Sequence, residues 1–199
     1  MAHSINDFKS ALSGGGARPN LFQVDLTLPT TIDPDEKYED GKFSILCKSA
    51  ALPASNIASI DVPFRGRIFK VAGDRTFDTW TITVINDQDF AIRTTMESWM
   101  QSIGQYADAS GFTNPASYMV DATVKQFKRG DKGSTLSTSS NPNATGSGLD
   151  IAKVYKFYSI FPTSISAIDL SYDSSDTIEE FTVDFQVQYW APEPVRNQS

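Results

Sequence analysis

The sequence predicts a mainly β fold, an antiparallel β sandwich or barrel with one flanking α-helix at about residues 89–104. Two stretches carry the strand prediction, residues 21–28 and 181–190, because apolar and polar side chains alternate along both of them. A third stretch, residues 92–103, instead repeats its apolar side chains at the spacing of a helix. Sheets with one apolar and one polar face are typical of antiparallel strands, since parallel sheets are usually covered on both faces.

Each alternating stretch has an apolar side and a polar side. The apolar sides comprise Phe22, Val24, Leu26 and Leu28 in the first stretch, and Phe181, Val183, Phe185, Val187 and Tyr189 in the last. The other sides carry Leu21, Gln23, Asp25 and Thr27, and Thr182, Asp184, Gln186, Gln188 and Trp190. Further strands are predicted where β-branched and aromatic residues are enriched, at residues 42–49, 65–72, 80–85, 118–127, 151–161 and 166–172.

The helix is predicted by an apolar stripe and by its flanking residues. The stripe consists of Ile92, Met96, Trp99, Met100 and Ile103. Acidic and amide side chains just before it suit a helix N-terminus, and Gly104 marks the end; the capping candidates are Asn86, Asp87 and Asp89. We interpret the stripe as a packing face and not as a cofactor site.

The length of 199 residues predicts a single domain over residues 1–199, with three irregular segments. Residues 1–16 are expected to be a flexible N-terminal segment, a short stretch of helical potential followed by a Gly-rich hinge. Residues 29–41 form an acidic loop, and residues 130–148 form a mobile loop rich in Ser, Thr, Asn and Gly.

Composition excludes several classes of protein. The net charge of −7 argues against a DNA-binding protein, because affinity for DNA comes largely from basic side chains that neutralise phosphates. The sequence has no apolar run long enough to span a bilayer and no apolar N-terminal signal, so we expect a soluble protein without stable membrane insertion. The lone Cys47 excludes an intrachain disulfide, and its apolar neighbours favour a small buried side chain over a reactive thiol.

No motif for catalysis, cofactor binding or metal binding is found, so we expect a protein that is not an enzyme and has no cofactor. The only histidine, His3, lies in the N-terminal segment, where it is a poor candidate for a general base. Asp33, Asp35 and Glu36 resemble part of a calcium loop, but the Gly and Glu expected later in such a loop are missing. A solvated acidic loop is the better interpretation.

Several stretches resemble the inner tail tube proteins of contractile-tailed, T4-like bacteriophages. They are residues 17–24 (Ala-Arg-Pro-Asn-Leu-Phe-Gln-Val), Cys47-Lys48 with residues 51–54 (Ala-Leu-Pro-Ala), residues 71–81 (Val-Ala-Gly-Asp-Arg-Thr-Phe-Asp-Thr-Trp-Thr) and the alternation that ends at Trp190. The resemblance runs in order from about Ala17 to Trp190 and extends more weakly to the tube proteins of type VI secretion. The loops at 29–41 and 130–148 are longer than the family pattern.

The resemblance implies a structural subunit of the virion. Such subunits form six-membered rings that stack into a tube inside a contractile sheath, and genome DNA passes through the bore without specific binding. The implied partners are further copies of the chain, the tail sheath protein, and the baseplate and tail terminator proteins, with assembly in the host cytoplasm. Two alternatives remain, the tube subunit of a phage-derived contractile injection system and, less favoured, a carbohydrate-binding β-sandwich adhesin.

Two sets of residues are candidates for these roles. Polar strand faces are predicted to line the bore, through Gln23, Asp25, Thr27, Asp184, Gln186 and Gln188. The alternative is that these faces meet solvent or a neighbouring subunit. A turn is predicted to contact a neighbouring subunit, with Gly73 at positive φ and charged partners nearby; its members are Gly73, Asp74, Arg75 and Asp78. A local turn closed by an intrachain ion pair is the alternative there.

Overall fold

The structure is a computed structural model that describes residues 4–12, 15–28, 32, 38–108, 110–129, 151–173 and 176–194. These residues form the helices α1 (Ile5–Ala11), α2 (Asp40–Leu46), α3 (Ala91–Ile103) and the short 3-10 helix η2 (Pro115–Ser117). The strands are β1 (Phe22–Leu26), β2 (Cys47–Ala50), β3 (Ser55–Phe64), β4 (Arg67–Phe77), β5 (Trp80–Ile85), β6 (Val120–Phe127), β7 (Ile151–Ile165), β8 (Glu180–Gln186) and β9 (Tyr189–Glu193).

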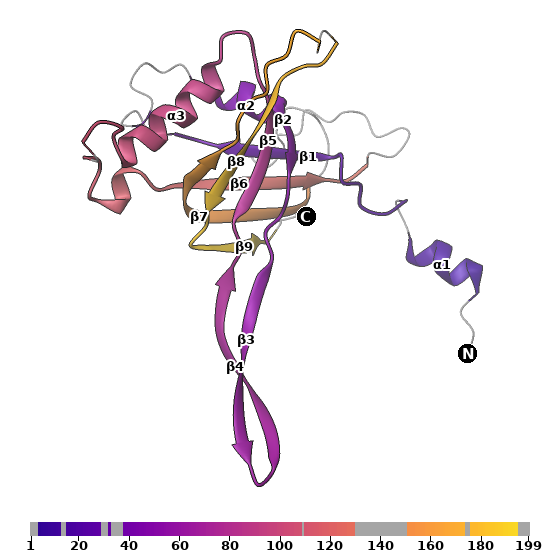
Figure 1. The fold of residues 1–199 in the computed structure, drawn as a ribbon. Coiled ribbons are helices and arrows are strands. Elements are labelled where there is room, and N and C mark those ends of the chain that lie inside the picture. The colour runs from indigo at the N-terminus through magenta and orange to yellow at the C-terminus, as the bar shows by residue number, and fades with distance from the viewer. Residues whose placement is uncertain are drawn as a thin grey trace.

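Seven strands form one antiparallel sheet that folds into two layers (Figure 1). Its order is β1-β6-β7-β8-β5-β2, with β9 paired to β7. The first layer holds β1, β6, β9 and the first part of β7; the second holds the end of β7 with β8, β5 and β2. In the described chain β1 and β2 end the path without pairing to each other. The predicted mainly β fold with a flanking helix is confirmed, as a two-layered sheet and not a closed barrel.

Strand β7 passes from one layer to the other at a bend. Its partner changes from β6 to β8 between Ile160 and Phe161. Just before this point Ser159 has φ 53°, and its backbone N–H donates to Asp121 Oδ1 at 3.0 Å. The buried side chains Phe157 and Ile160 are therefore three residues apart instead of two, which keeps both of them facing the core through the bend.

The core between the layers contains a column of aromatic rings. Trp80 of β5 stacks on Phe157 of β7, with centroids 4.5 Å apart and an interplanar angle of 7°. Phe185 of β8 packs against Trp80 at 5.5 Å and against Trp99 of α3 at 5.8 Å. All four side chains are fully buried. The column therefore connects the first layer, the second layer and the helix.

Helix α3 forms where the sequence predicted it and covers one end of the sandwich. Ile92, Met96 and Trp99 of the predicted stripe are buried, and the indole N–H of Trp99 donates to the carbonyl of Tyr118 at 2.7 Å. Asp87 accepts a hydrogen bond from the backbone N–H of Ala91 at 3.2 Å, which satisfies a free donor of the first turn. The same carboxylate forms an ion pair with Lys42 of α2.

Residues 42–49 were predicted as a strand, and this prediction is wrong for most of the segment. The chain forms α2 as far as Leu46, and only then β2. The apolar residues Phe43, Leu46 and Cys47 lie at helical spacing on the buried side, whereas Ile45 is 83% exposed. The predicted acidic loop at residues 29–41 thus ends inside a helix, while residues 29–31 and 33–37 lie outside the described residues.

Two further strand predictions need correction near the C-terminus. Residues 166–172 do not form a strand. The predicted strand through residue 190 is interrupted after Gln186, where β8 ends, although the next residue, Val187, is still buried. The chain then turns, and β9 pairs with β7 in the first layer. Tyr189 consequently leaves the face of β8 and stacks on Tyr158, with centroids 4.5 Å apart. The predicted loop at residues 130–148 and His3 lie outside the described residues.

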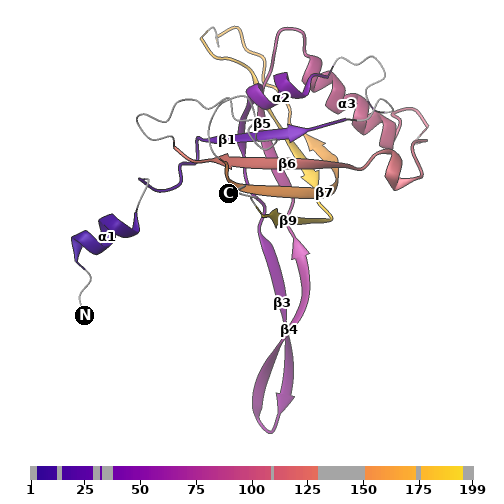
Figure 2. The same cartoon turned by 180° about the vertical axis from the view of Figure 1, so that it is seen from behind.

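The hairpin of β3 and β4 projects away from the sandwich, and α1 lies apart from it at the end of the N-terminal segment (Figures 1 and 2). Strands of ten and eleven residues give the hairpin a length of about 30 Å. Arg65 and Gly66 close it with φ 46° and 82°, the positive values that a two-residue hairpin turn requires. Arg65 was predicted to lie in a strand and is instead part of this turn. No helix of the described chain is long and apolar enough to cross a membrane.

Removing the central ring of the aromatic column tests this description of the core. We expect Trp80→Ala to lower the free energy of unfolding by about 3–5 kcal/mol, because the cavity would separate Phe157 from Phe185. Urea unfolding followed by far-ultraviolet circular dichroism, below the concentration of self-assembly, measures the change. Tyr172→Ala is the control, since that side chain is fully exposed, and should alter stability by less than about 0.5 kcal/mol. Equal effects of the two substitutions would contradict the described core.

Candidate assembly surfaces

The hairpin exposes a continuous apolar face. Ile60, Val62 and Phe64 alternate along β3, and the strand register sets Val71 beside Ile60 and Phe69 beside Val62. These five side chains are 41–66% exposed. On the opposite face, Lys70 forms an ion pair with Asp61 at 2.8 Å. Large exposed apolar faces on folded proteins commonly mark surfaces that bind another protein.

The predicted turn at Gly73, Asp74 and Arg75 is wrong, because these residues lie inside β4. Gly73 is not among the described glycines with positive φ, which are Gly15, Gly16 and Gly66. Its role is close packing at a β-bulge between the two strands. A Cβ atom at Gly73 would lie 3.1 Å from Ile60 Cγ1 and 3.2 Å from the carbonyl oxygen of Ala58.

The charged residues at the base of the hairpin differ in whether they bond to other residues of the described chain. Asp78 accepts a hydrogen bond from Asn56 Nδ2 at 3.1 Å. Asp74 and Arg75 are exposed, and neither forms an ion pair with another residue that the structure describes. The intrachain ion pair that was the alternative interpretation is therefore not found in the described chain, and the two charges are free to meet another molecule.

The outer face of the second layer is polar and has little positive charge. It carries Thr81 and Thr83 of β5 beside Asp184 and Thr182 of β8, followed by Gln186. Thr81 donates to Asp184 through its hydroxyl at 2.5 Å. The nearby cation of β2, Lys48, forms an ion pair with Glu180 at 2.6 Å. Gln188, also predicted for the bore, lies in the exposed bend after β8.

The other predicted bore residues lie on the first layer. Asp25 of β1 accepts a hydrogen bond from Gln23 Nε2 and forms an ion pair with Lys125 of β6, both at 2.7 Å. Thr27 follows β1 and donates to Asp40 at 2.8 Å. Strands β6 and β7 separate β1 from β8 in the sheet. The structure therefore does not bring the two predicted sets together on one surface.

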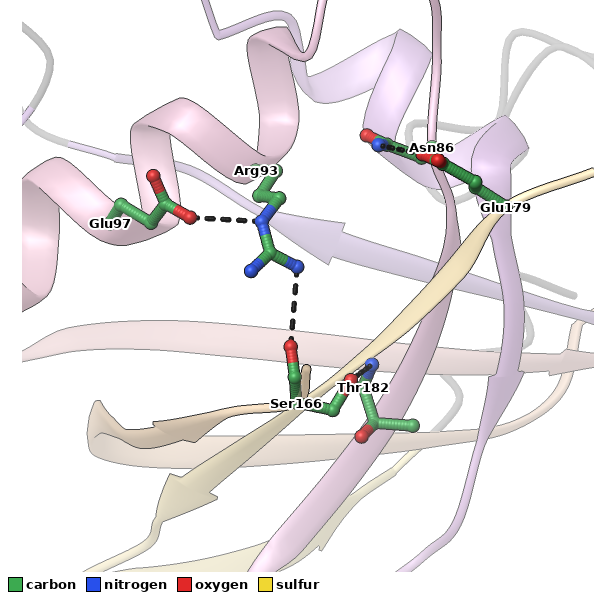
Figure 3. A network of polar contacts seen from close by, with 6 residues as sticks. All are labelled: Asn86, Arg93, Glu97, Ser166, Glu179 and Thr182. Atoms are coloured by element: carbon green, nitrogen blue, oxygen red, sulfur yellow. Dashed lines mark hydrogen bonds and ion pairs between the residues drawn. The ribbon is translucent and has the colours of Figure 1, made fainter. Parts of the chain in front are cut away.

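A polar network fixes the base of the loop between β7 and β8 against α3 (Figure 3). Arg93 of α3 donates to Glu97 at 2.9 Å and to the carbonyl of Ser166 at 3.3 Å. Ser166 Oγ in turn accepts from the backbone N–H of Thr182 at 2.9 Å. At the other end of the loop, Asn86 Nδ2 donates to Glu179 at 3.0 Å. These contacts hold both ends of the loop at the edge of the second layer.

Within the part of the chain that the structure describes, the groove and the titratable groups form no catalytic arrangement. An open groove of 710 Å³ is lined mainly by apolar side chains, among them Phe22, Leu52, Val124 and Tyr155. Within the described ranges no three His, Cys, Asp or Glu residues lie close enough to hold a metal ion. Cys47 is buried, as predicted, and burial raises the pKa of its thiol to about 12.

The fold is shared with chains from contractile injection machines. The chain superposes on a chain of an extracellular contractile injection system, from its PVC sheath–tube complex in the extended state, with a TM-score of 0.58, 14% identity and coverage of 98% of this chain and 100% of that one. A chain of the tube-terminating cap of the anti-feeding prophage gives a TM-score of 0.57 and 14% identity, covering 89% and 91%. At such identities the likeness establishes the fold alone.

The family is established by sequence. The model of the phage tail tube protein family matches residues 17–193, and the chain belongs to this family. It is 35% identical over 180 residues to the tail tube protein gp19 of Enterobacteria phage T4, covering 89% of this chain and 93% of that protein. The tail tube protein of Serratia phage KSP90 is 23% identical over 185 residues, covering 92% and 93%. The resemblance seen in the sequence is confirmed.

The half of the hairpin formed by β3 was missed by sequence reasoning. Its signal was present in the alternation of Ile60, Val62 and Phe64, but Pro63 interrupts the run, and proline is usual only at edges of sheets. In a two-stranded hairpin both strands are edges, so the proline is tolerated.

The buried state of Cys47 gives a test by thiol labelling. In the folded protein we expect the thiol to react with a disulfide reagent at pH 8 at least about a hundred times more slowly than in urea, because it is buried and stays protonated. The raised pKa also contributes stability that is complete below pH 9.0 and is lost as the pH rises toward about 12. Colorimetric labelling measures the rate. Rapid stoichiometric labelling of the folded chain would contradict the described packing.

Proposed function

We propose that the chain is the structural subunit of a phage tail tube, which forms stacked hexameric rings inside a contractile sheath and a channel for DNA delivery into the host. The observation that carries the proposal is the family match along residues 17–193. The relatives with 35% and 23% identity are named tail tube proteins of phages, whereas the injection-system chains share only 14% identity. This difference favours a phage tail over a phage-derived injection machine.

The proposed partners follow from the same proteins. The superposable chains come from complexes described as a sheath–tube complex, a tube-terminating cap and a baseplate. We infer corresponding contacts of this chain with tail sheath, terminator and baseplate proteins, in a virion assembled in the host cytoplasm. The role is structural and not enzymatic, in keeping with surfaces that are shaped for protein contacts.

Self-assembly is proposed to depend on the hairpin. A two-stranded hairpin is marginally stable in water on its own, and this one exposes an apolar face and two free charges at its base, Asp74 and Arg75. Another copy of the chain covering the hairpin removes that apolar surface from water and pairs the charges. Gly73 keeps the two strands close at this point, and Asp78 orients the base through Asn56. A bidentate contact to Arg75 is the expected form of the pairing.

The N-terminal arm is a second candidate for contacts between copies. Helix α1 begins with a capping box in which Ser4 and Asp7 bond reciprocally. Its side chains Ile5, Phe8 and Leu12 lie at helical spacing, and all three are 48–66% exposed. A neighbouring copy that covers this stripe would account for an apolar helix that stands apart from its own sandwich.

The bore is proposed to be lined by the outer face of the second layer. Asp184 and Gln186 lie there among threonines, and Gln188 follows in the exposed bend after β8. The nearby Lys48 is neutralised by Glu180. A lining of hydroxyl, amide and carboxylate groups stays hydrated and offers phosphates no row of cations on which to stick. The first layer, with Gln23, Asp25 and Thr27, carries Lys125 and Lys156 in ion pairs and is the less favoured lining.

Assembly of the purified protein tests the proposed function and the role of Arg75. We expect rings and tubes by electron microscopy, and we expect Arg75→Ala to raise the concentration needed for assembly by about tenfold or more, because an interfacial ion pair is lost. Arg129→Ala, an exposed arginine outside the hairpin, is the matched control and should assemble like the parent. A parent protein that stays monomeric at all concentrations would reject the tube. Normal assembly of Arg75→Ala would reject only the role of this residue.

Lysine substitutions distinguish the two candidate linings. Tubes of Gln186→Lys assembled with short duplex DNA should retain DNA that is protected from nuclease and released by salt, because cations in the bore hold phosphates. Parent tubes should retain none. Gln23→Lys is the matched control, and any DNA it binds should be digested. Protection by Gln23→Lys and not by Gln186→Lys would assign the bore to the first layer instead.

A further inference from the structure

The open groove of the sandwich lies near the start of β1 and is lined by both layers. Phe22, Val124 and Tyr155 line it from the first layer, and residues 48–52 line it from β2 and the segment that follows β2. Pro19, just before β1, lines it as well. Both strands that end the sheet path, β1 and β2, therefore contribute to the groove. Its volume of 710 Å³ is left open by the part of the chain that the structure describes.

Helix α1 carries an apolar stripe that has no partner in the described chain. Ile5, Phe8 and Leu12 are 66%, 60% and 48% exposed, and no residue of α1 is buried. On the opposite side of the helix lies Ser10, whose hydroxyl donates to the carbonyl of Asn6 at 2.7 Å. A helix of seven residues is well below the roughly 12–15 residues at which an isolated helix becomes stable in water. Packing of the stripe is therefore the contribution that α1 lacks.

A glycine turn directs α1 away from its own sandwich. Gly15 and Gly16 have φ 78° and 77°, values that glycine adopts without steric cost. The backbone N–H of Gly15 donates to the carbonyl of Leu12 at 3.1 Å, and a Cβ atom at Gly16 would lie 3.5 Å from Leu12 Cδ1. In both views α1 consequently lies outside the sandwich, beyond the start of β1 (Figures 1 and 2). The stripe and the groove of one copy are thus held apart.

The reach of the arm limits what it can contact. Pro19, which lines the groove, follows Leu12 by seven residues, and seven residues span at most about 25 Å. Helix α1 adds about 10 Å. The arm therefore leaves each copy beside that copy's own groove and reaches no further than an adjacent copy. A contact between two different surfaces of identical copies is heterologous, and it repeats from copy to copy until a rotation closes it into a ring.

We propose that α1 of one copy docks in the groove of an adjacent copy, an inference that rests on the proposed function and names the surface that receives the arm. Ile5, Phe8 and Leu12 enter the groove and pack against Phe22 and residues 48–52, while the side of α1 that carries Ser10 faces water. The contact is small, so it does not hold two free copies together. It gains strength in the assembly, where the other contacts between the copies keep the arm close to its groove.

Cysteine cross-linking between two different chains tests the docking. Both chains carry Cys47→Ala to remove the native thiol; one adds Phe8→Cys and the other adds Leu52→Cys. After mixing, co-assembly and oxidation with copper phenanthroline, we expect a disulfide between residues 8 and 52 of different chains, detected by non-reducing electrophoresis and peptide mass mapping. Ser10→Cys replaces Phe8→Cys in the matched control. It should give at least about tenfold less cross-linked product, because residue 10 faces away from the groove.

Two outcomes of the cross-linking would overturn the proposal. One is equal product from the Phe8→Cys and Ser10→Cys chains, since the docking would then not depend on the stripe. The other is found with Phe8→Cys and Leu52→Cys in the same chain, oxidised below the concentration of assembly. A rapid internal disulfide in the monomer, at a yield that assembly does not raise, would show that α1 occupies the groove of its own copy.

Substitutions on the two sides of the contact give an independent test. We expect Phe8→Asp and Leu52→Asp each to raise the concentration needed for assembly by about tenfold or more, and the two together to do little more than either alone, because both remove one contact. Phe8→Leu and Ser10→Asp are the controls and should assemble near the parent concentration. Sedimentation and electron microscopy measure assembly, and thermal unfolding checks that each variant is folded.

The results separate the docking from the proposed function. Normal assembly of Phe8→Asp by a parent that forms rings and tubes would overturn the docking and leave the tube function intact. Additive effects of Phe8→Asp and Leu52→Asp would also overturn it, because the two residues would then act at different contacts. A parent protein without rings or tubes would instead reject the proposed function.

Discussion

An apolar hairpin that the described part of its own chain does not cover is the constraint on which the rest of the structure depends. Among the described strands, β3 and β4 pair only with each other, and their apolar face exposes Val62 and Phe69 to water. Exposed sheet edges and apolar surface are liabilities for a protein that stays alone. When identical copies cover one another, burial of the same surface stabilises the assembly. The hairpin is thus understandable as part of an assembly, as the membership in the tail tube family implies.

The sandwich provides the rigid body from which the hairpin extends. Trp80 joins both layers through Phe157 and Phe185, and it lies on β5, the strand that directly follows the hairpin. Asp87 links the other end of β5 to α3 and α2 by its hydrogen bond to Ala91 and its ion pair with Lys42. A displacement at the hairpin base is therefore resisted by the fully buried aromatic column of the core.

Sequence patterns predicted those elements in which the buried apolar residues recur at one regular spacing, that of a helix or that of a strand. The stripe ending at Ile103 and the alternation at β5 predicted α3 and β5 with bounds correct to within two residues.

The predictions failed where tertiary packing decides the structure. The run at Phe43 is short enough to suit a helix or a strand, and packing against Tyr38 at 5.7 Å selects the helix. Gly73 was assigned to a turn because glycine has two uses, positive φ and close approach, and sequence alone does not separate them. Surfaces for assembly carry no such signal, since their partner lies on another copy.

The hairpin is proposed to be buried in the assembled tube, and a cryo-electron microscopy reconstruction of tubes formed by the purified chain tests this most directly. The reconstruction is expected to show six subunits per ring, with the apolar face of Ile60, Val62 and Phe69 covered by a neighbouring copy. A tube in which the hairpins project into solvent, with subunits joined entirely through other surfaces, would contradict the account.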